Sequence, residues 1–340
     1  MTIGTDSSTE GTIPGHGADG RAERPMLSRD ADAMYWMSRY VERSEHIARL
    51  LLVNSSFLID VGDLAPTLQA QQWQSILTIL RVESLTDGPD LSLRVPKHLV
   101  LDLDNPNSIV SCITRARENA RGIRENISSE MWENLNTLYW MLNSDEARLR
   151  FEESPDDLYR TVMTASMLFQ GLTDQTLPHD QRWLFTQLAK YLERVDVTCR
   201  IIQIKSEFYR LHEHLFETTI RNLTWMAVLR SCCSIEAYRR HNLGDMDPSL
   251  LTGFLILERN FPRSIRFGVS NALAAMTAIR TSTRGGQIDP AERILGRLDA
   301  QLEYAEMGEI LLEGIPAYLQ KLQTMASEAA GAVARSYFMV

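Results

Sequence analysis

Apolar residues recur every three or four positions along nearly the whole chain after residue 26, which is the spacing of amphipathic α-helices. The clearest stripe has steps of four, three, four, three and four residues between Ile109 and Ile127, and Pro106 predicts the first turn of that helix. The one segment with a strand-like pattern, 91–103, contains Pro96, which argues against a strand. A first helix is predicted from an N-cap and acidic first turn at Ser28–Asp32 through a stripe that ends at Leu52. Further helices are predicted over 66–86, 128–145, 155–172, 179–214, 217–240, 289–313 and 315–336.

The first 25 residues differ from the rest, because they are rich in Gly, Ser and Thr and contain almost no large apolar side chain. Such a segment cannot bury enough surface to offset its ordering entropy, so we expect residues 1–25 to be a disordered tail. Residues 26–340 are then predicted to form one all-α domain. No apolar run reaches the roughly 18 to 20 residues of a membrane span, and no signal peptide is apparent, so we expect a cytoplasmic protein without a membrane anchor.

Composition narrows the chemistry further. The formal net charge of −9 argues against a nucleic-acid-coating protein. Four irregularly spaced cysteines are too few for a disulfide scaffold and are expected to be reduced. The sequence contains no Glu-x-x-His pair, HExxH, Walker A or GxGxxG motif, so we predict neither a metal nor a cofactor.

The chain also repeats itself in three places, in the same order and with nearly constant offsets of 151, 152 and 156 residues. We therefore predict an internally duplicated bundle, with halves at about 27–150 and 178–336 packed about a pseudo-twofold axis. That arrangement would bring Glu42 close to Glu193. The matching segments are Tyr40–Arg49 with Tyr191–Arg200, Trp73–Leu80 with Trp225–Cys232, and Pro106–Ile123 with Pro262–Ile279.

The first repeated segment carries a polar face whose acidic members, Glu42 and Glu193, are the candidate catalytic residues. One interpretation is structural: the charges form ion pairs along an exposed helix, or between the two halves if these meet. The other places both glutamates in a shared central cleft, as general bases or as acceptors for a substrate ammonium. Candidate binding residues on the same faces are Arg39, Glu45, Arg49, Asp196 and Arg200.

A second charged cluster lies off the Ile109–Ile127 stripe, and guanidinium groups of this kind can hold a carboxylate or a phosphate with two hydrogen bonds. The matching positions of the second copy carry one charged residue in five, so the charge is one-sided. We interpret the cluster as a binding face for a partner or an anionic ligand. The alternative is that C-terminal helices cover the matching face of the second copy. Arg117, Arg121 and Arg124 are predicted to lie on one helical face. The cluster comprises Arg115 and the candidate binding residues Arg117, Glu118, Arg121, Arg124 and Glu125.

Two long segments, 26–51 and 105–136, resemble the bacterial alpha-E domain family, and the resemblance extends over residues 26–336. His46 stands where the family pattern carries Asn. The resemblance implies an all-helical fold and genes encoded beside a circularly permuted ATP-grasp ligase, often with a transglutaminase-like cysteine peptidase and a proteasome-like hydrolase. That context suggests the making or breaking of amide bonds.

Three functions follow as expectations. The first is an accessory protein that binds an ATP-grasp ligase, or its peptide product, through the Arg117–Glu125 face. The second is an enzyme of amide or peptide metabolism that uses Glu42, Glu193 and the neighbouring arginines. The third is a purely structural helical scaffold.

Overall fold

The computed structural model describes residues 26–62, 66–82, 85, 90–212, 218–242, 246–283 and 287–339. Within these ranges the regular structure is entirely helical, which confirms the predicted all-α class. The segment expected to be a disordered tail, 1–25, lies outside the described residues. No helix in the described ranges has both the length and the hydropathy needed to cross a bilayer.

The fold is built from fifteen α-helices within the described ranges, with a 3₁₀ turn at Arg124–Asn126 and a final π turn at Ala334–Phe338. The helices are α1 (Ser28–Val61), α2 (Pro66–Ile79), α3 (Leu91–Val100), α4 (Ile109–Gly122), α5 (Ser129–Leu142), α6 (Asp145–Glu153), α7 (Pro155–Thr176), α8 (Gln181–His212), α9 (Thr218–Ser231), α10 (Ile235–His241), α11 (Pro248–Leu257), α12 (Ile265–Thr283), α13 (Pro290–Glu303), α14 (Met307–Glu313) and α15 (Ile315–Val333).

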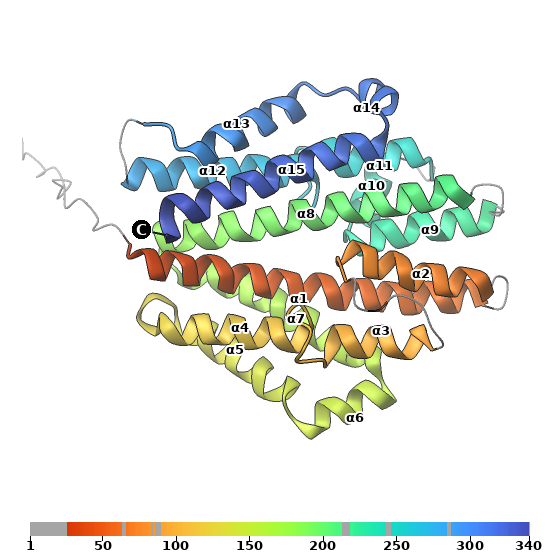
Figure 1. The fold of residues 1–340 in the computed structure, drawn as a ribbon, viewed down its shortest axis with the longest axis horizontal. Coiled ribbons are helices and arrows are strands. Elements are labelled where there is room, and N and C mark those ends of the chain that lie inside the picture. The colour runs from red at the N-terminus through yellow and green to blue at the C-terminus, as the bar shows by residue number, and fades with distance from the viewer. Residues whose placement is uncertain are drawn as a thin grey trace, which may run out of the picture.

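The two longest helices, α1 and α8, lie side by side through the middle of the molecule (Figure 1). They run parallel, because contacts between them advance along both helices together. The backbone N–H of Met26 donates to the Gln181 side chain, and the Ser38 hydroxyl donates to the Thr186 carbonyl at 2.8 Å. Further along the pair, α2 packs against α8 and α9 packs against α1. Each of these short helices thus contacts the long helix that does not precede it in the sequence.

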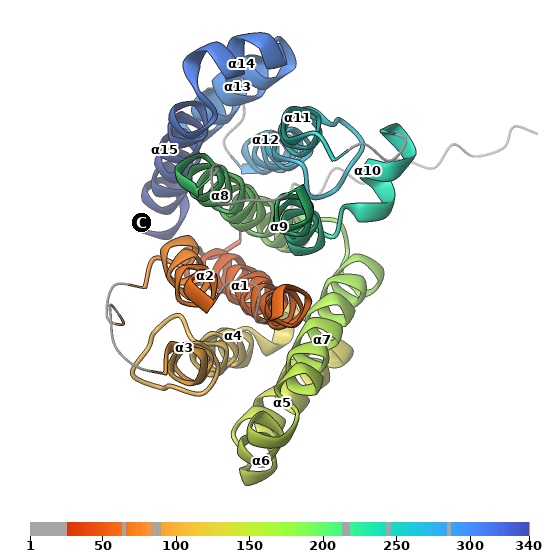
Figure 2. The ribbon, with the colours of Figure 1, turned by 90° about the vertical axis from the view of Figure 1, so that its right-hand side faces the viewer.

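The other helices cover the central pair from two sides, as the end view shows (Figure 2). On one side α4 packs on α1, α5 packs on α4, and α7 contacts both α1 and α5. On the other side α12 packs on α8, α13 packs on α12, and α15 contacts both α8 and α13. The central pair is therefore enclosed along most of its length.

The apolar core falls into two large clusters stacked along the central helices. One cluster reaches as far as Val41 on α1 and Leu192 on α8, and the other resumes at Ile47 and Val195. The polar side chains between these positions are buried as well, and they form a layer that separates the two clusters.

Several predicted helix boundaries are wrong for local reasons. Serine rather than proline starts α4: the Ser108 hydroxyl accepts from Ser111 N–H, so the helix begins three residues after Pro106. The predicted helix 217–240 is interrupted at Cys233, whose left-handed φ of 52° lies between the end of α9 and the start of α10.

Five further segments depart from the prediction. The predicted helix 289–313 is divided into α13 and α14, and the Ile109 stripe leaves regular α-helix after Gly122. The segment 91–103 is largely the helix α3, which tolerates Pro96 inside it. The helices α6 and α11 are absent from the sequence prediction.

Candidate functional site

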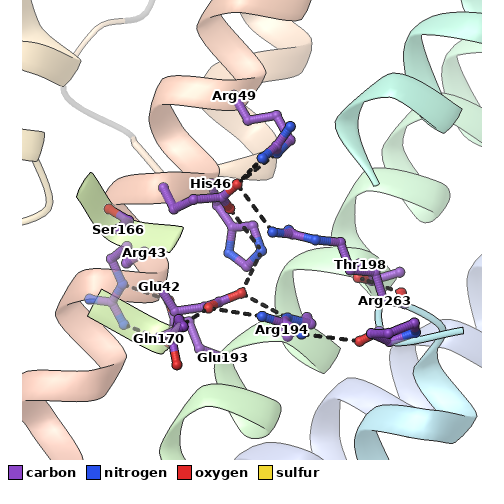
Figure 3. A network of polar contacts seen from close by, with 12 residues as sticks. Glu42, Arg43, His46, Arg49, Ser166, Gln170, Glu193, Arg194, Thr198 and Arg263 are labelled. Atoms are coloured by element: carbon purple, nitrogen blue, oxygen red, sulfur yellow. Dashed lines mark hydrogen bonds and ion pairs between the residues drawn. The ribbon is translucent and has the colours of Figure 1, made fainter. Parts of the chain in front are cut away.

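The polar layer is centred on two glutamate–arginine pairs that cross between the central helices (Figure 3). Arg194 of α8 donates from Nε to Glu42 Oε1 of α1 at 2.8 Å. Arg43 of α1 donates from Nε to Glu193 Oε1 of α8 at 2.7 Å. Each glutamate thus binds the arginine that follows the other glutamate in sequence, and we call this reciprocal arrangement the Glu–Arg exchange.

Both carboxylates of the exchange are buried, with Glu42 2% and Glu193 1% exposed. Burial acts to raise the pKa of Glu193, but the charges of Arg43 and Arg39 outweigh it and lower the pKa below its usual value. Burial and Arg194 oppose each other in the same way at Glu42, whose pKa is also lowered. Both groups are therefore firmly ionised at neutral pH and are poor proton acceptors.

The surroundings of Glu42 are filled by further charged groups. Glu45 binds Arg49 on its own helix and Arg263 at 3.1 Å. His46 Nε2 lies 3.4 Å from Glu42 Oε1 and 3.8 Å from Glu45 Oε2. Burial, with the charges of its arginine neighbours, lowers the pKa of His46 to about 4 despite the two glutamates, so its ring is neutral at pH 7.

Ligand atoms of Glu42, Glu45 and His46 lie within 4.8 Å of one another, which is the geometry of a three-residue metal site. The charges fit a cation poorly. Arg194 binds Glu42, and Arg49 and Arg263 both bind Glu45 Oε1, which leaves the cluster with one net positive charge. Glu45 Oε2 has no hydrogen-bond partner, but a divalent cation bound there would be repelled by the three guanidinium groups.

A cavity of about 180 Å³ lies beside Glu193. Four arginines from α1, α8 and the end of α2 line it, together with Glu193 and Asp196, and its remaining wall is largely apolar. Glu193 borders this space, but both of its oxygens are bound by Arg39 and Arg43. The arginines are Arg39, Arg43, Arg81 and Arg200.

The structure thus brings the candidates of the repeated faces into one buried region, in closed ion pairs rather than as free carboxylates in an open cleft. Asp196 and Arg200 pair at 2.8 Å, one turn beyond Glu193. Sequence reasoning missed Arg43 and Arg194, although both follow a glutamate in the two copies of the repeated motif. The contribution of Arg263 had no comparable signal in the sequence.

The candidate face on α4 is divided by the structure. Arg117 packs inward, with its guanidinium 4.4 Å from the centre of the Tyr139 ring, and donates from Nε to Asn136. Arg124 stacks over Trp132 at 4.8 Å. The prediction that Arg117, Arg121 and Arg124 share one helical face is therefore wrong in part, because Arg117 packs against aromatic rings and Arg124 lies in the 3₁₀ turn that follows α4.

The rest of that face is open to solvent. Arg124 and Glu125 lie beyond the end of α4, in the 3₁₀ turn. Glu118 and Arg121 remain on the exposed surface of α4 and pair with each other at 2.5 Å. Arg121 is the more accessible, with 66% of its side chain exposed.

The fold and the buried layer together define an all-helical protein whose two central helices are joined by a glutamate–arginine exchange. Residues 26–338 match the Alpha-E family, described as a predicted alpha-helical domain with a conserved ER motif, and the chain belongs to that family. The dipeptides Glu42-Arg43 and Glu193-Arg194 have the sequence of that motif.

The chain is also similar to uncharacterized proteins of Mycobacterium bovis and Mycobacterium tuberculosis. Each is 23% identical over 315 residues, an alignment that covers 85% of this chain and 34% of the relative. The chain therefore spans about a third of the length of these relatives. No solved structure matches it.

Proposed function

We propose that this protein is a non-catalytic accessory module that works with an ATP-grasp ligase in a system that makes or breaks amide bonds. The observation that carries the non-catalytic part is the Glu–Arg exchange. Its carboxylates are buried, ionised and bound by arginine, so they are suited to fastening α1 to α8 and not to accepting a proton from a substrate. The ligase, and a transglutaminase-like peptidase as a further partner, are proposed from the family resemblance.

The length of the mycobacterial relatives supports a role beside other domains. This chain aligns with about a third of each of them, so there the helical unit accompanies further sequence in one polypeptide. A unit that occurs joined to other sequence is expected to present a surface to it. We propose that the exposed pair Glu118 and Arg121 on α4 belongs to that surface, with Trp140 of α5, which is 59% exposed.

We also propose that the chain arose by internal duplication and that its halves are related by a pseudo-twofold axis. The reciprocal form of the exchange supports this, since two equivalent helices would form the same pair twice. Two local motifs also recur at the expected offsets. The ends of α2 and α9 have left-handed residues at Arg81 and Cys233, and Ser108 and Ser264 use the same hydroxyl contact at the starts of α4 and α12.

The docking surface is tested by capture of the purified ATP-grasp ligase from the same gene neighbourhood on immobilised protein. We expect Arg121→Glu to reduce capture at least tenfold, because it reverses the charge of an exposed side chain without disturbing the core. Arg150→Glu on α6 is the matched control, since Arg150 is also exposed and paired with a glutamate one turn away. Equal capture by both variants would remove the α4 surface from the proposal.

The competing enzyme hypothesis is tested with the double variant Glu42→Gln and Glu193→Gln, at a temperature where circular dichroism shows it to be folded. An accessory role predicts that the folded variant still supports amide-bond formation by the ligase. Complete loss of activity by a fully folded variant would instead favour catalysis by these glutamates.

A further inference from the structure

The cavity beside Glu193 is a charged space that the accessory role leaves unexplained. Its volume of about 180 Å³ is roughly ten times what a single water molecule needs. A second hollow of about 80 Å³ adjoins it and shares Arg39, Arg81 and Asp196. The Glu–Arg exchange involves only the carboxylate of Glu193 on this side. The cavity is therefore not required to hold α1 and α8 together.

The charges around the cavity do not cancel. Four arginines face two carboxylates, which leaves a formal charge of +2. His46 also lines the space but is neutral at pH 7, because burial lowers its pKa to about 4. Water can solvate this excess only partly, since the rest of the wall includes Ile47, Leu99 and Val197. A bound anion with two negative charges would balance it.

One arginine of the lining has hydrogen-bonding capacity to offer. Arg200 is not that one, because its terminal nitrogens bind Asp196 and the Ile79 carbonyl and its Nε is too deeply buried to reach a ligand. Arg81 contacts Asp196 and Gln323 through one nitrogen at 3.3 and 3.4 Å, which is long for a hydrogen bond. Arg81 can therefore turn toward a ligand at little cost.

Arg81 is also held in an unusual backbone conformation. Its φ is 56°, a left-handed value that costs an ordinary side chain free energy and that glycine would adopt freely. Its side chain lines both hollows and is 60% exposed. An arginine in this position places an exposed positive charge beside a positively charged cavity.

The corresponding space beside Glu42, the other carboxylate of the exchange, is occupied by an arginine side chain. Beside Glu42, the Arg263 side chain, which is 11% exposed, extends to Glu45 at 3.1 Å. In the repeat, Arg263 aligns with Asn107, a shorter side chain that accepts from Arg43 and lines the cavity beside Glu193. A guanidinium group therefore lies beside Glu42, whereas a cavity lies beside Glu193.

We propose that the cavity lined by Arg39, Arg43, Arg81 and Arg200 binds a compact oxyanion with two negative charges, either a phosphate group or a small dicarboxylate. The Arg81 guanidinium donates hydrogen bonds to it, while Arg200 stays bound to Asp196 and adds positive charge. Arg39 and Arg43, which remain bound to Glu193, contribute positive charge. Guanidinium groups suit both kinds of oxyanion, because each offers paired acceptor oxygens.

Isothermal titration calorimetry on the full chain tests this with inorganic phosphate and with succinate as separate probes. Acetate serves as the monoanion, and sodium chloride keeps the ionic strength constant. We expect one site, with at least one dianion binding no less than tenfold more tightly than acetate. Binding of phosphate alone would assign a phosphate group, and binding of succinate alone would assign a dicarboxylate.

Two variants tie the binding to this cavity. Arg81→Gln changes a largely exposed side chain and is expected to fold normally. We expect it to weaken dianion binding at least tenfold, which corresponds to about 1.4 kcal/mol. Arg200→Gln removes one of the positive charges that line the cavity, and is expected to weaken binding similarly. Arg150→Gln, on the distant surface of α6, is expected to leave binding unchanged.

Two results would overturn the proposal. One is the absence of binding by phosphate and by succinate at millimolar concentrations. The other is binding that Arg81→Gln and Arg200→Gln both leave at the level of the unmodified protein. Neither result bears on the accessory role, which depends on the Glu–Arg exchange and on the α4 surface.

Discussion

Replacing Glu193 by glutamine removes one negative charge from the centre of the molecule and leaves the shape of the side chain nearly unchanged. No cavity is created, so the effect isolates the ionic contribution. In the unmodified protein Glu193 accepts hydrogen bonds from Arg39 at 2.7 Å and from Arg43 at 2.7 and 3.1 Å. The glutamine side chain can accept through one oxygen only, and it carries no charge to balance the two guanidinium groups.

The expected loss of stability in Glu193→Gln follows from the burial of Arg39 and Arg43. Their side chains are only 11% and 23% exposed, so water cannot replace the lost carboxylate fully. Removing one partner from a buried ion pair costs about 3–5 kcal/mol. That is a large part of the roughly 5–15 kcal/mol that stabilises a typical folded domain. We therefore expect Glu193→Gln to unfold at a much lower urea concentration than the unmodified protein.

Urea denaturation followed by circular dichroism measures this loss. Glu146→Gln on α6 is the matched control, because Glu146 is 66% exposed and pairs with Arg150 one turn away. We expect the control to cost at most about 1 kcal/mol. A loss below about 1 kcal/mol for Glu193→Gln would refute the view that the exchange fastens the two central helices.

Three further outcomes are expected. Burial holds the pKa of His46 at about 4, against 6.5 in an unfolded chain, so the unfolded state takes up a proton first as the pH falls and stability drops between pH 6.5 and 4. His46→Asn should remove about 3 kcal/mol of this pH dependence, measured by denaturation at several pH values. Gly268→Ala should destabilise by about 1–3 kcal/mol, because the added Cβ would lie 2.6 Å from a valine methyl of α8. Gly296→Ala, with open space around it, should stabilise by about 0.5–1 kcal/mol, and equal thermal shifts would contradict this argument. Arg117→Gln should cost about 1–2 kcal/mol through its lost aromatic stacking and change tryptophan fluorescence, whereas Arg121→Gln should do neither.

Hydrophobic periodicity predicted the fold class and most of the helices, because most described helices bury one apolar face in the core. It failed where backbone geometry decides the outcome. The break at Cys233 depends on a left-handed residue that no glycine marks, and the start of α4 depends on the choice between Pro106 and Ser108 as the initiating residue. Neither choice changes the apolar pattern.

The sequence predicted which residues belong to the candidate site but not how they pair with one another. Repeat detection selected Glu42 and Glu193 correctly as members of one buried region. It could not show that each binds the other's arginine, because spacing along one helix suggests only partners on that helix. The inward stacking of Arg117 was missed for a similar reason, since its aromatic partners lie on a different helix.

The Glu–Arg exchange has a consequence for how such a sequence can change during evolution. Glu42 and Arg43 are neighbours in the chain, yet each has its partner about 150 residues away on α8. A substitution at Glu42 is therefore compensated by a change at Arg194 and not by a change at the adjacent arginine. Among related sequences, we expect covariation to link the first glutamate with the second arginine, and the first arginine with the second glutamate.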